Sequence, residues 1–195
     1  SSSKDYSKVD NLCFIRNGQI IRNKLKAPVN INNLPIPDYS LFESARFYRP
    51  MAGRVYKTIP IETNRGCPYS CTFCNSPSIT KLYREYSQNT FFRKKTISKI
   101  REEILYLIKK WDAEYVYFCS DTFLTLTDEK FDEFIDFYKE IKIPFWLQSR
   151  AETITEYSVK KLKEVGCHRM SLGLEHGNEE FRKRVLKKIF DNDEI

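Results

Sequence analysis

From Thr58 onward, predicted strands and helices alternate regularly along this chain. Short runs rich in β-branched and aromatic residues predict strands over 58–63, 114–119, 143–149 and 168–174. Apolar residues three or four apart predict helices over 97–111, 128–141, 155–165 and 178–189. Such alternation forms a parallel sheet with right-handed crossovers. The sequence therefore predicts an α/β fold, and its four strand–helix units suit an open or partial (β/α) barrel because they cannot close an eight-stranded one.

Residues 1–57 lack this alternation. Asn17-Gly18 lies between two apolar runs, 12–16 and 19–22, and both residues tolerate the positive φ of a type I′ turn, which predicts a β-hairpin. The Pro-rich residues 27–38 then favour an extended strap. The sequence thus divides into 1–57, a hairpin and Pro-rich linker, and 58–195, part of a partial barrel.

The chain is basic, with 33 Lys and Arg against 26 Asp and Glu, a formal net charge of +7. Nine basic residues and three Glu lie between residues 81 and 110. A basic region can bind nucleic acid or an anionic cofactor, but no nucleic-acid-binding motif accompanies this one, which favours a solvated helix face. No run approaches 18 consecutive apolar residues and no signal peptide is evident, so we expect a cytoplasmic protein without a membrane span.

Three of the six cysteines cluster at the spacing C-x3-C-x2-C, namely Cys67, Cys71 and Cys74. A secreted disulfide framework spreads its cysteines more evenly, so the cluster indicates a metal site in a reducing compartment. Structural zinc takes four protein ligands, and no second CxxC follows here. A 4Fe–4S cluster takes one ligand per iron, so three cysteines would leave one iron open to a small molecule. Cys119 and Cys167, at strand positions, are expected to be small buried apolar residues.

Polar or metal-binding residues follow each predicted strand, at 64–67 (NRGC), 120–122 (SDT), 148–150 (QSR) and 175–177 (EHG). In parallel α/β folds the chemistry gathers at the carboxyl ends of the strands. Because all four strands deliver such groups to one rim, and the first carries the cysteines, the sequence predicts an active site there.

The cysteine spacing, the aromatic residue before the last cysteine and the preceding Arg-Gly closely resemble the signature of the radical S-adenosylmethionine (SAM) enzymes. The resemblance covers about residues 58–195. It implies that Cys67, Cys71 and Cys74 hold a 4Fe–4S cluster whose fourth iron binds the amino and carboxylate groups of SAM. One electron from that cluster would cleave SAM to a 5′-deoxyadenosyl radical. The implied fold is a partial barrel, in agreement with the strand–helix alternation.

The resemblance also implies which side chains bind SAM. Phe73 would lie beside the adenine, the alternative being a loop aromatic packed into the core. Many relatives hold the methionyl amino group with Gly-Gly-Glu after the second strand, whereas this chain has SDTF at 120–123. Asp121 would accept the same hydrogen bond, or else cap a helix or turn.

Two further residues match positions that contact SAM in the relatives. Arg150 stands where they offer a cation to the SAM carboxylate, which a guanidinium pairs with well, and the alternative is a surface salt bridge. Glu175 would contact the ribose hydroxyls, or else cap the last helix. Gln148 and His176 are candidate substrate or cofactor contacts. The sequence identifies no catalytic residue.

Within the superfamily, the chain resembles the cobalamin-binding branch. The matching segments are NGQ at 17–19, LPIPD at 34–38, Phe42, SDTF at 120–123 and GLEHG at 173–177. The resemblance implies that 1–57 is the tail of a preceding cobalamin domain, and that the chain is an internal piece of a larger enzyme. The implied reaction is cobalamin-dependent methyl transfer, or a related radical reaction, on a small-molecule substrate. An electron donor such as flavodoxin or ferredoxin would reduce the cluster.

Three other functions stay open at this level. A methylthiotransferase that modifies tRNA would suit the basic region, but it needs a second set of three cysteines, and only Cys13 lies upstream. A non-catalytic zinc or iron–sulfur module would bind its metal without responding to SAM. A nucleic-acid-binding protein driven by the charge of +7 would bind less tightly as salt is added.

Overall fold

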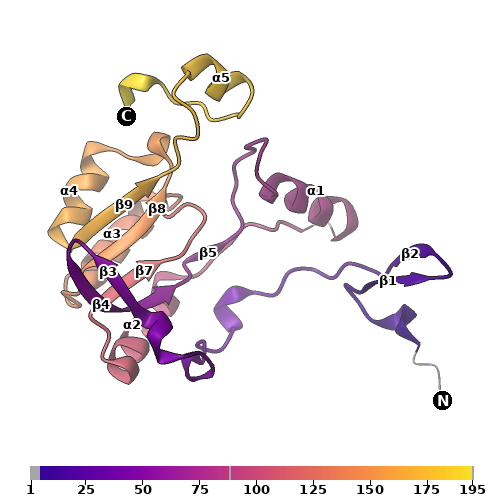
Figure 1. Cartoon of the computed structure of the whole chain (residues 1–195), viewed down its shortest axis with the longest axis horizontal. Coiled ribbons are helices and arrows are strands. Elements are labelled where there is room, and N and C mark those ends of the chain that lie inside the picture. Colours follow the sequence, from indigo (N-terminus) through magenta and orange to yellow (C-terminus); the bar gives the residue numbers. More distant parts are fainter. Residues whose placement is uncertain (1–4, 88, 195) are drawn as a thin grey trace.

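A five-stranded sheet in the order β3-β4-β7-β8-β9 forms the centre of the computed structural model, which describes residues 5–87 and 89–194. The strands are β3 (Tyr48–Met51), β4 (Arg54–Ile61), β7 (Tyr115–Phe118), β8 (Phe145–Ser149) and β9 (Cys167–Leu172). The last four of these strands pair in parallel, which confirms the predicted sheet. The sheet is curled and carries its helices along one side, as expected for part of a (β/α) barrel (Figure 1).

An antiparallel edge strand extends the sheet beyond the prediction. β3 pairs with β4 across a tight turn in which Ala52 and Gly53 both have positive φ. Pro50 fits at this edge, because an edge strand need not donate every backbone hydrogen bond. β4 begins at Arg54, so the predicted division between residues 57 and 58 falls inside this strand.

Helices α2 (Ile97–Trp111), α3 (Asp128–Tyr138) and α4 (Glu156–Glu164) follow β4, β7 and β8 and confirm three predicted helices. The side chain of Thr96 accepts a hydrogen bond from Lys99 N, which caps the N-terminus of α2. Helix α1 (Ser76–Ser87) is not among the predicted elements. Helix α5 (Glu179–Arg184) ends before the predicted limit of residue 189, because the chain turns back around the side chain of Arg182.

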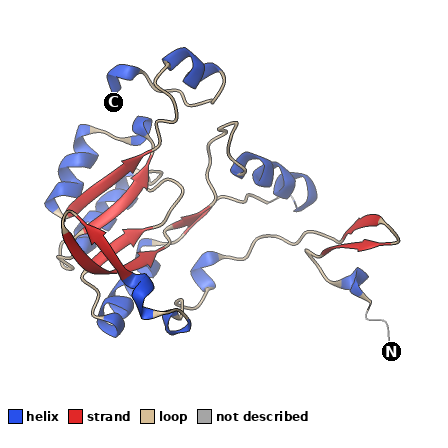
Figure 2. Cartoon of the chain, in the orientation of Figure 1, coloured by secondary structure: helices blue, strands red, loops and turns tan. Residues whose placement is uncertain are grey.

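The core lies between the sheet and the helices α2, α3 and α4, which cover one side of the sheet (Figure 2). Its centre is aromatic. Alternation along β7 places Val116 and Phe118 in this core. The ring of Phe118 is 5.5 Å from that of Phe134 on α3 and 5.4 Å from that of Phe145 on β8. Such edge-to-face contacts fix the spacing of neighbouring strands, and with it the spacing of the loops that follow them.

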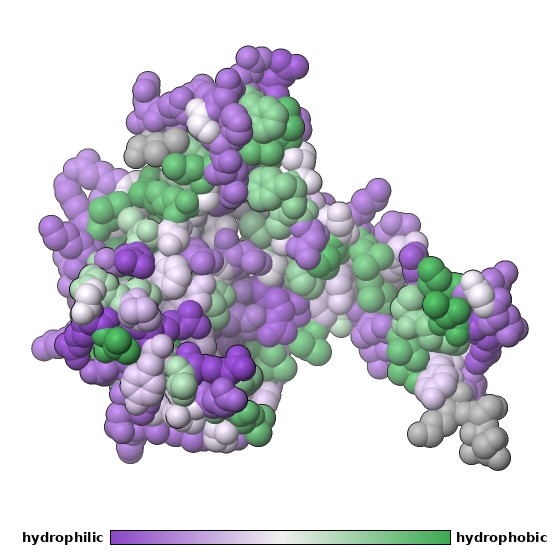
Figure 3. Space-filling view, viewed as in Figure 1, coloured by the Kyte–Doolittle hydropathy of each residue, from purple (hydrophilic) through white to green (hydrophobic). Residues whose placement is uncertain are grey.

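The predicted hairpin is confirmed as β1 (Cys13–Arg16) and β2 (Gln19–Arg22), an antiparallel pair. Asn17 and Gly18 have φ of 52° and 74°, the combination that a type I′ turn needs. The hairpin lies away from the sheet, and apolar side chains including Ile15 and Ile20 are exposed on it (Figure 3).

The strap between the hairpin and the sheet is docked on the α/β unit. The hydroxyl of Tyr39 donates to the carbonyl of Pro60 at 2.6 Å. Asn32 accepts from Thr96 N at 2.7 Å through its side-chain oxygen, and its amide donates to the carbonyl of Lys94. Single-turn 3-10 helices interrupt the strap at Ile31–Asn33, Tyr39–Leu41 and Ser44–Phe47. These contacts tie the strap to β4 and to the segment that leads into α2.

The two cysteines expected at buried strand positions are not buried. Cys119 is exposed and Cys167 is partly exposed. Val116 and Phe118 face the helices, so alternation turns Cys119 to the opposite side of the sheet, away from the core.

Among the residues that the structure describes, no helix is both long and apolar enough to cross a membrane.

Candidate active site

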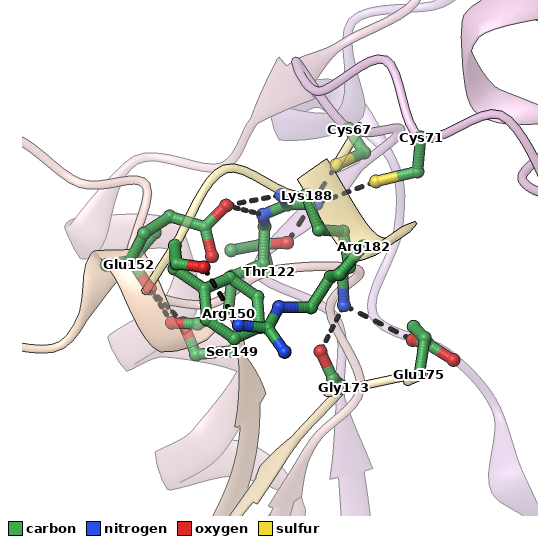
Figure 4. Close-up of polar contacts among 12 residues, drawn as sticks. Cys67, Cys71, Thr122, Ser149, Arg150, Glu152, Gly173, Glu175, Arg182 and Lys188 are labelled. Carbon is green, nitrogen blue, oxygen red and sulfur yellow. Dashed lines mark hydrogen bonds and ion pairs between the residues drawn. The ribbon is translucent and has the colours of Figure 1, made fainter. Parts of the chain in front are cut away.

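A cavity of about 370 Å³ opens at the carboxyl ends of the parallel strands. The cysteine loop forms one wall, and the ends of β7, β8 and β9 form the others. The segment that follows α5 also reaches the cavity, through Lys188. Loops distant in sequence therefore meet at one rim, as the order of the parallel strands predicts (Figure 4).

The cysteine loop is held at its start by buried polar contacts. It follows β5 (Asn64–Arg65), which pairs with β6 (Arg93–Lys94). The side-chain amide of Asn64 donates to the carbonyl of Gly66 at 3.1 Å. Gly66 has φ of +84°, and a Cβ built there would stand 2.7 Å from a ring carbon of Phe91. The turn into the loop thus requires glycine, both for its backbone conformation and for the space.

Gly66→Ala is expected to lower the free energy of unfolding by more than about 1 kcal/mol, because alanine is strained at positive φ. Gly18→Ala is the matched control, since Gly18 also has positive φ but has nothing within 4 Å of the added Cβ. Urea unfolding of both variants separates the strain from the contact with Phe91. A loss for Gly66→Ala no larger than that for Gly18→Ala would contradict the steric part of the argument.

The three clustered thiols all line this cavity, and none forms a disulfide. Cys71 is the most buried of them, with 7% of its surface exposed. The Sγ of Cys67 lies 3.8 Å from the hydroxyl of Thr122, at the end of β7, and burial raises the pKa of this thiol. The Sγ of Cys74 accepts from the backbone N–H of Ser76 at 3.4 Å. Each thiol thus has a polar neighbour of its own.

This donor set suits an iron–sulfur cluster. Over the ranges 5–87 and 89–194, no three His, Cys, Asp or Glu side chains are grouped so that they could hold a single metal ion. A 4Fe–4S cluster takes its thiolates on different irons, so its ligands stand further apart than those of one ion. Cys67, Cys71 and Cys74 are soft ligands on one short loop, which fits such a cluster with a fourth iron left open.

Arg150 is one of two buried cations that line the cavity. Its Nη1 donates to Cys71 Sγ at 2.8 Å, and its Nε donates to Glu152 Oε1 at 2.7 Å. Its guanidinium carbon also lies 4.0 Å from the centre of the Tyr69 ring. The alternative of a surface salt bridge does not hold, because the pair with Glu152 is almost entirely buried.

Glu175 lies at the opposite wall beside a second buried cation, Lys188. Lys188 Nζ is 3.2 Å from Glu175 Oε1, and it also donates to the carbonyl of Gly173. The side chain of Lys188 is 4% exposed and that of Glu175 is 39% exposed. Glu175 does not cap the last helix, because the side chain of Asn178 caps it.

Lys188 is the site residue that sequence analysis missed. It falls within the last predicted helix, where a lysine normally indicates a solvated face. The helix instead ends at Arg184, and Lys187 has a positive φ of 57°. The segment between them is tied to the cysteine loop, since Thr72 donates to the carbonyls of Val185 and Leu186. No local pattern could have located this turn.

The other predicted contacts occupy different places. Phe73 lines the cavity and is 54% exposed, so it is not packed into the core. Asp121 and Gln148 also line the cavity, and the N-cap of α3, the helix that follows Asp121, is Thr127. His176 does not reach this cavity. It lines a separate hollow beside α5, and its Nδ1 accepts from the backbone N–H of Asn178.

Comparison with known proteins decides the family. Residues 61–192 match the family model of the radical SAM superfamily. The chain belongs to the radical SAM superfamily. The matched region runs from the end of β4 to the segment beyond α5, so it contains the three cysteines and every wall of the cavity.

Two curated relatives carry the word methyltransferase in their names. One is the uncharacterized methyltransferase PH0819 of Pyrococcus horikoshii, 26% identical over 97% of this chain and 39% of that protein. The other is the bacteriochlorophyllide d C-8(2)-methyltransferase of Chlorobaculum tepidum, 28% identical over 86% of this chain and 38% of that protein. The chain therefore spans less than half the length of the relatives that it matches.

Solved structures share the radical SAM fold with this chain. OxsB, a cobalamin-dependent radical SAM enzyme solved with aqua-cobalamin and SAM bound, has a TM-score of 0.68 and 20% identity. The match covers 95% of this chain and 27% of the OxsB chain. TsrM from Kitasatospora setae, a radical SAM methyltransferase solved with cobalamin and a 4Fe–4S cluster, has a TM-score of 0.50 and 16% identity. The match covers 66% of this chain and 24% of the TsrM chain. The likeness to these two structures is one of fold.

Proposed function

We propose that this chain forms the site at which a radical SAM enzyme cleaves SAM reductively, with Cys67, Cys71 and Cys74 as the ligands of a 4Fe–4S cluster. The observation that carries the proposal is that these three thiols share one cavity with two buried cations and two carboxylates. When bound, the reduced cluster supplies the electron that cleaves SAM to methionine and a 5′-deoxyadenosyl radical. The chain's own residues bind and orient the reactants.

The charged walls of the cavity match the charged groups of SAM. Lys188 and Arg150 supply positive charge for the carboxylate of the methionyl group. Asp121, on the same cavity, supplies an acceptor for the methionyl ammonium. Lys188 contacts only Oε1 of Glu175, so the other carboxylate oxygen can accept hydrogen bonds from the ribose hydroxyls.

Phe73 supplies an apolar surface for the adenine. Its ring is largely exposed at the cavity, where a planar base can cover it. Thr122 and Ser149 add hydroxyls to the same walls. Gln148, at the end of β8, is proposed as a contact to substrate or cofactor. A pre-arranged set of this kind orients the bound reactants relative to each other.

For the whole protein we propose cobalamin-dependent methyl transfer, or a related radical reaction, on a small molecule. The methyltransferase names of the relatives support this, as does the likeness to cobalamin-dependent structures. Residues 1–57 would be the tail of a preceding cobalamin domain, which would give the exposed apolar hairpin a surface to pack on. The electron donor would be a flavodoxin or ferredoxin. Six unpaired cysteines suit a reducing, cytoplasmic compartment.

Electron paramagnetic resonance (EPR) on anaerobically reconstituted, dithionite-reduced protein tests the cleavage site. We expect a 4Fe–4S signal whose g-values change when SAM is added, because SAM would bind the open iron. Lys188→Met is expected to weaken SAM binding, measured as the SAM concentration that gives half of the spectral change, by about tenfold or more. The reason is the loss of a buried charge-assisted contact.

Lys187→Met is the matched control, because Lys187 precedes Lys188 and does not line the cavity. It is expected to keep the wild-type SAM response. A cluster signal that ignores SAM would overturn the proposed cleavage site, and zinc in place of iron would return the cysteines to a structural role. Equal SAM affinity of the Lys188→Met variant and the wild type would remove Lys188 from the assignment.

A further inference from the structure

We infer that Arg150 raises the reduction potential of the cluster by donating a charged hydrogen bond to the sulfur of Cys71. This inference rests on the proposed function only in that Cys71 must be a cluster ligand. Hydrogen bonds to the cysteine sulfurs and the local net charge are among the factors that set iron–sulfur potentials. A positive donor at a ligand sulfur stabilises the more negative, reduced state of the cluster.

The guanidinium of Arg150 is held so that one N–H faces the sulfur. Glu152 Oε1 accepts from both Nε and Nη2 on one edge, which leaves Nη1 directed to Cys71 Sγ at 2.8 Å (Figure 4). The ring of Tyr69 covers one face of the group at 4.0 Å. Contacts on the edge and on the face together leave the group little freedom to turn away.

Burial makes this contact electrostatically strong. The side chains of Arg150 and Glu152 are 6% and 14% exposed, and Cys71 is 7% exposed. Water screens little between such groups, so the charge of Arg150 acts on the sulfur in a medium of low dielectric constant. Glu152 contacts the edge of the guanidinium that points away from Nη1, and its negative charge partly neutralises the positive charge of Arg150. The potential should therefore respond in opposite directions when one or the other charge is removed.

A role in tuning the cluster is compatible with a contact between Arg150 and SAM. A guanidinium has five N–H donors, and the hydrogen bonds seen for Arg150 are made by Nε, Nη1 and Nη2, one to each atom. Two N–H groups remain for a carboxylate. The two roles separate experimentally, because the effect on the potential does not require SAM.

The test is a potentiometric titration of the reconstituted protein in the absence of SAM, with the reduced cluster followed by EPR. Arg150→Gln removes the positive charge and is expected to shift the midpoint to more negative potential. At a fixed applied potential the ratio of reduced to oxidised cluster should fall by up to about tenfold, which is 59 mV for a one-electron couple. Arg150→Lys keeps the positive charge but lacks the planar set of guanidinium N–H donors, so its midpoint should shift less than that of Arg150→Gln.

Glu152→Gln provides the decisive control, because it keeps an acceptor for Arg150 while removing the opposing charge. It is expected to shift the midpoint to more positive potential. Arg101→Gln, which changes a charge exposed on α2, should leave the midpoint unchanged. Iron and sulfide content are measured for each variant, so that midpoints are compared at equal cluster occupancy.

A purely structural role for Arg150 makes a different prediction. In that case Arg150→Gln and Glu152→Gln would both loosen the loop and lower cluster content, with midpoints unchanged or shifted in the same direction. Either result overturns the inference. If Arg150→Gln loses the cluster, opposite shifts of Arg150→Lys and Glu152→Gln would still support it, and shifts of one sign would still overturn it. Failure of the SAM response leaves these midpoints interpretable, so the proposed function is judged separately.

Discussion

Cys71→Ala is expected to abolish cluster binding after anaerobic reconstitution. Loss of a residue that merely supports a metal ligand costs about 10- to 100-fold in affinity, so loss of the ligand itself should cost more than about 100-fold. The variant also leaves the Nη1 of Arg150 buried without the sulfur to which it donates. Iron and sulfide content, together with the visible absorption of the cluster, measures the effect.

The other cysteines of the chain provide the controls for that experiment. Cys119→Ala and Cys167→Ala remove thiols that do not line the cavity, and both variants are expected to keep wild-type iron content. Circular dichroism of the apo proteins shows whether each variant still folds. Full iron content in folded Cys71→Ala, or loss of iron in Cys119→Ala, would mean that a different set of thiols holds the metal.

Lys95→Met is expected to cost about 3–5 kcal/mol of unfolding free energy, because it leaves a buried carboxylate without its counter-charge. Lys95 Nζ lies 2.6 Å from Glu103 Oε2, and the two side chains are only 4% and 2% exposed. Within the described part of the chain, Glu103 Oε1 has no hydrogen-bond partner. Lys95 therefore carries most of the stabilisation of this carboxylate, and urea unfolding measures its loss.

The double variant Lys95→Met/Glu103→Leu removes both charges and is expected to recover most of that loss, since apolar residues of similar size often replace a buried ion pair at little cost. Lys130→Ala is the exposed counterpart. It breaks the pair with Glu133 on the surface of α3, and should cost less than about 1 kcal/mol. A single Lys95→Met variant as stable as the double variant would show that Glu103 is satisfied in another way.

Much of the fold follows from local patterns in the sequence. Periodicity locates the parallel strands and three of the helices, and Asn17-Gly18 defines the hairpin turn. The antiparallel strand β3 was not predicted, because its turn, Ala52-Gly53, is not a typical hairpin pair. Helix α1 was not predicted either, although Ile79, Leu82, Tyr83 and Tyr86 recur within it at helical spacing. It follows directly on the cysteine loop and lies outside the strand–helix alternation from which the other helices were predicted.

The sequence by itself determined the family, the spacing of the three clustered cysteines and the rim where the strands end. Ligand spacing within one loop and apolar periodicity within one element are local properties, and local properties can be read along the chain. Only the tertiary structure decided that Arg150 donates to Cys71 and that Lys188 enters the cavity beside Glu175. It also decided that His176 lies outside that cavity. Each of these depends on how segments far apart in sequence meet, and no local pattern encodes such a meeting. For Lys188 the meeting depends on the turn after α5 and on the burial of Arg182.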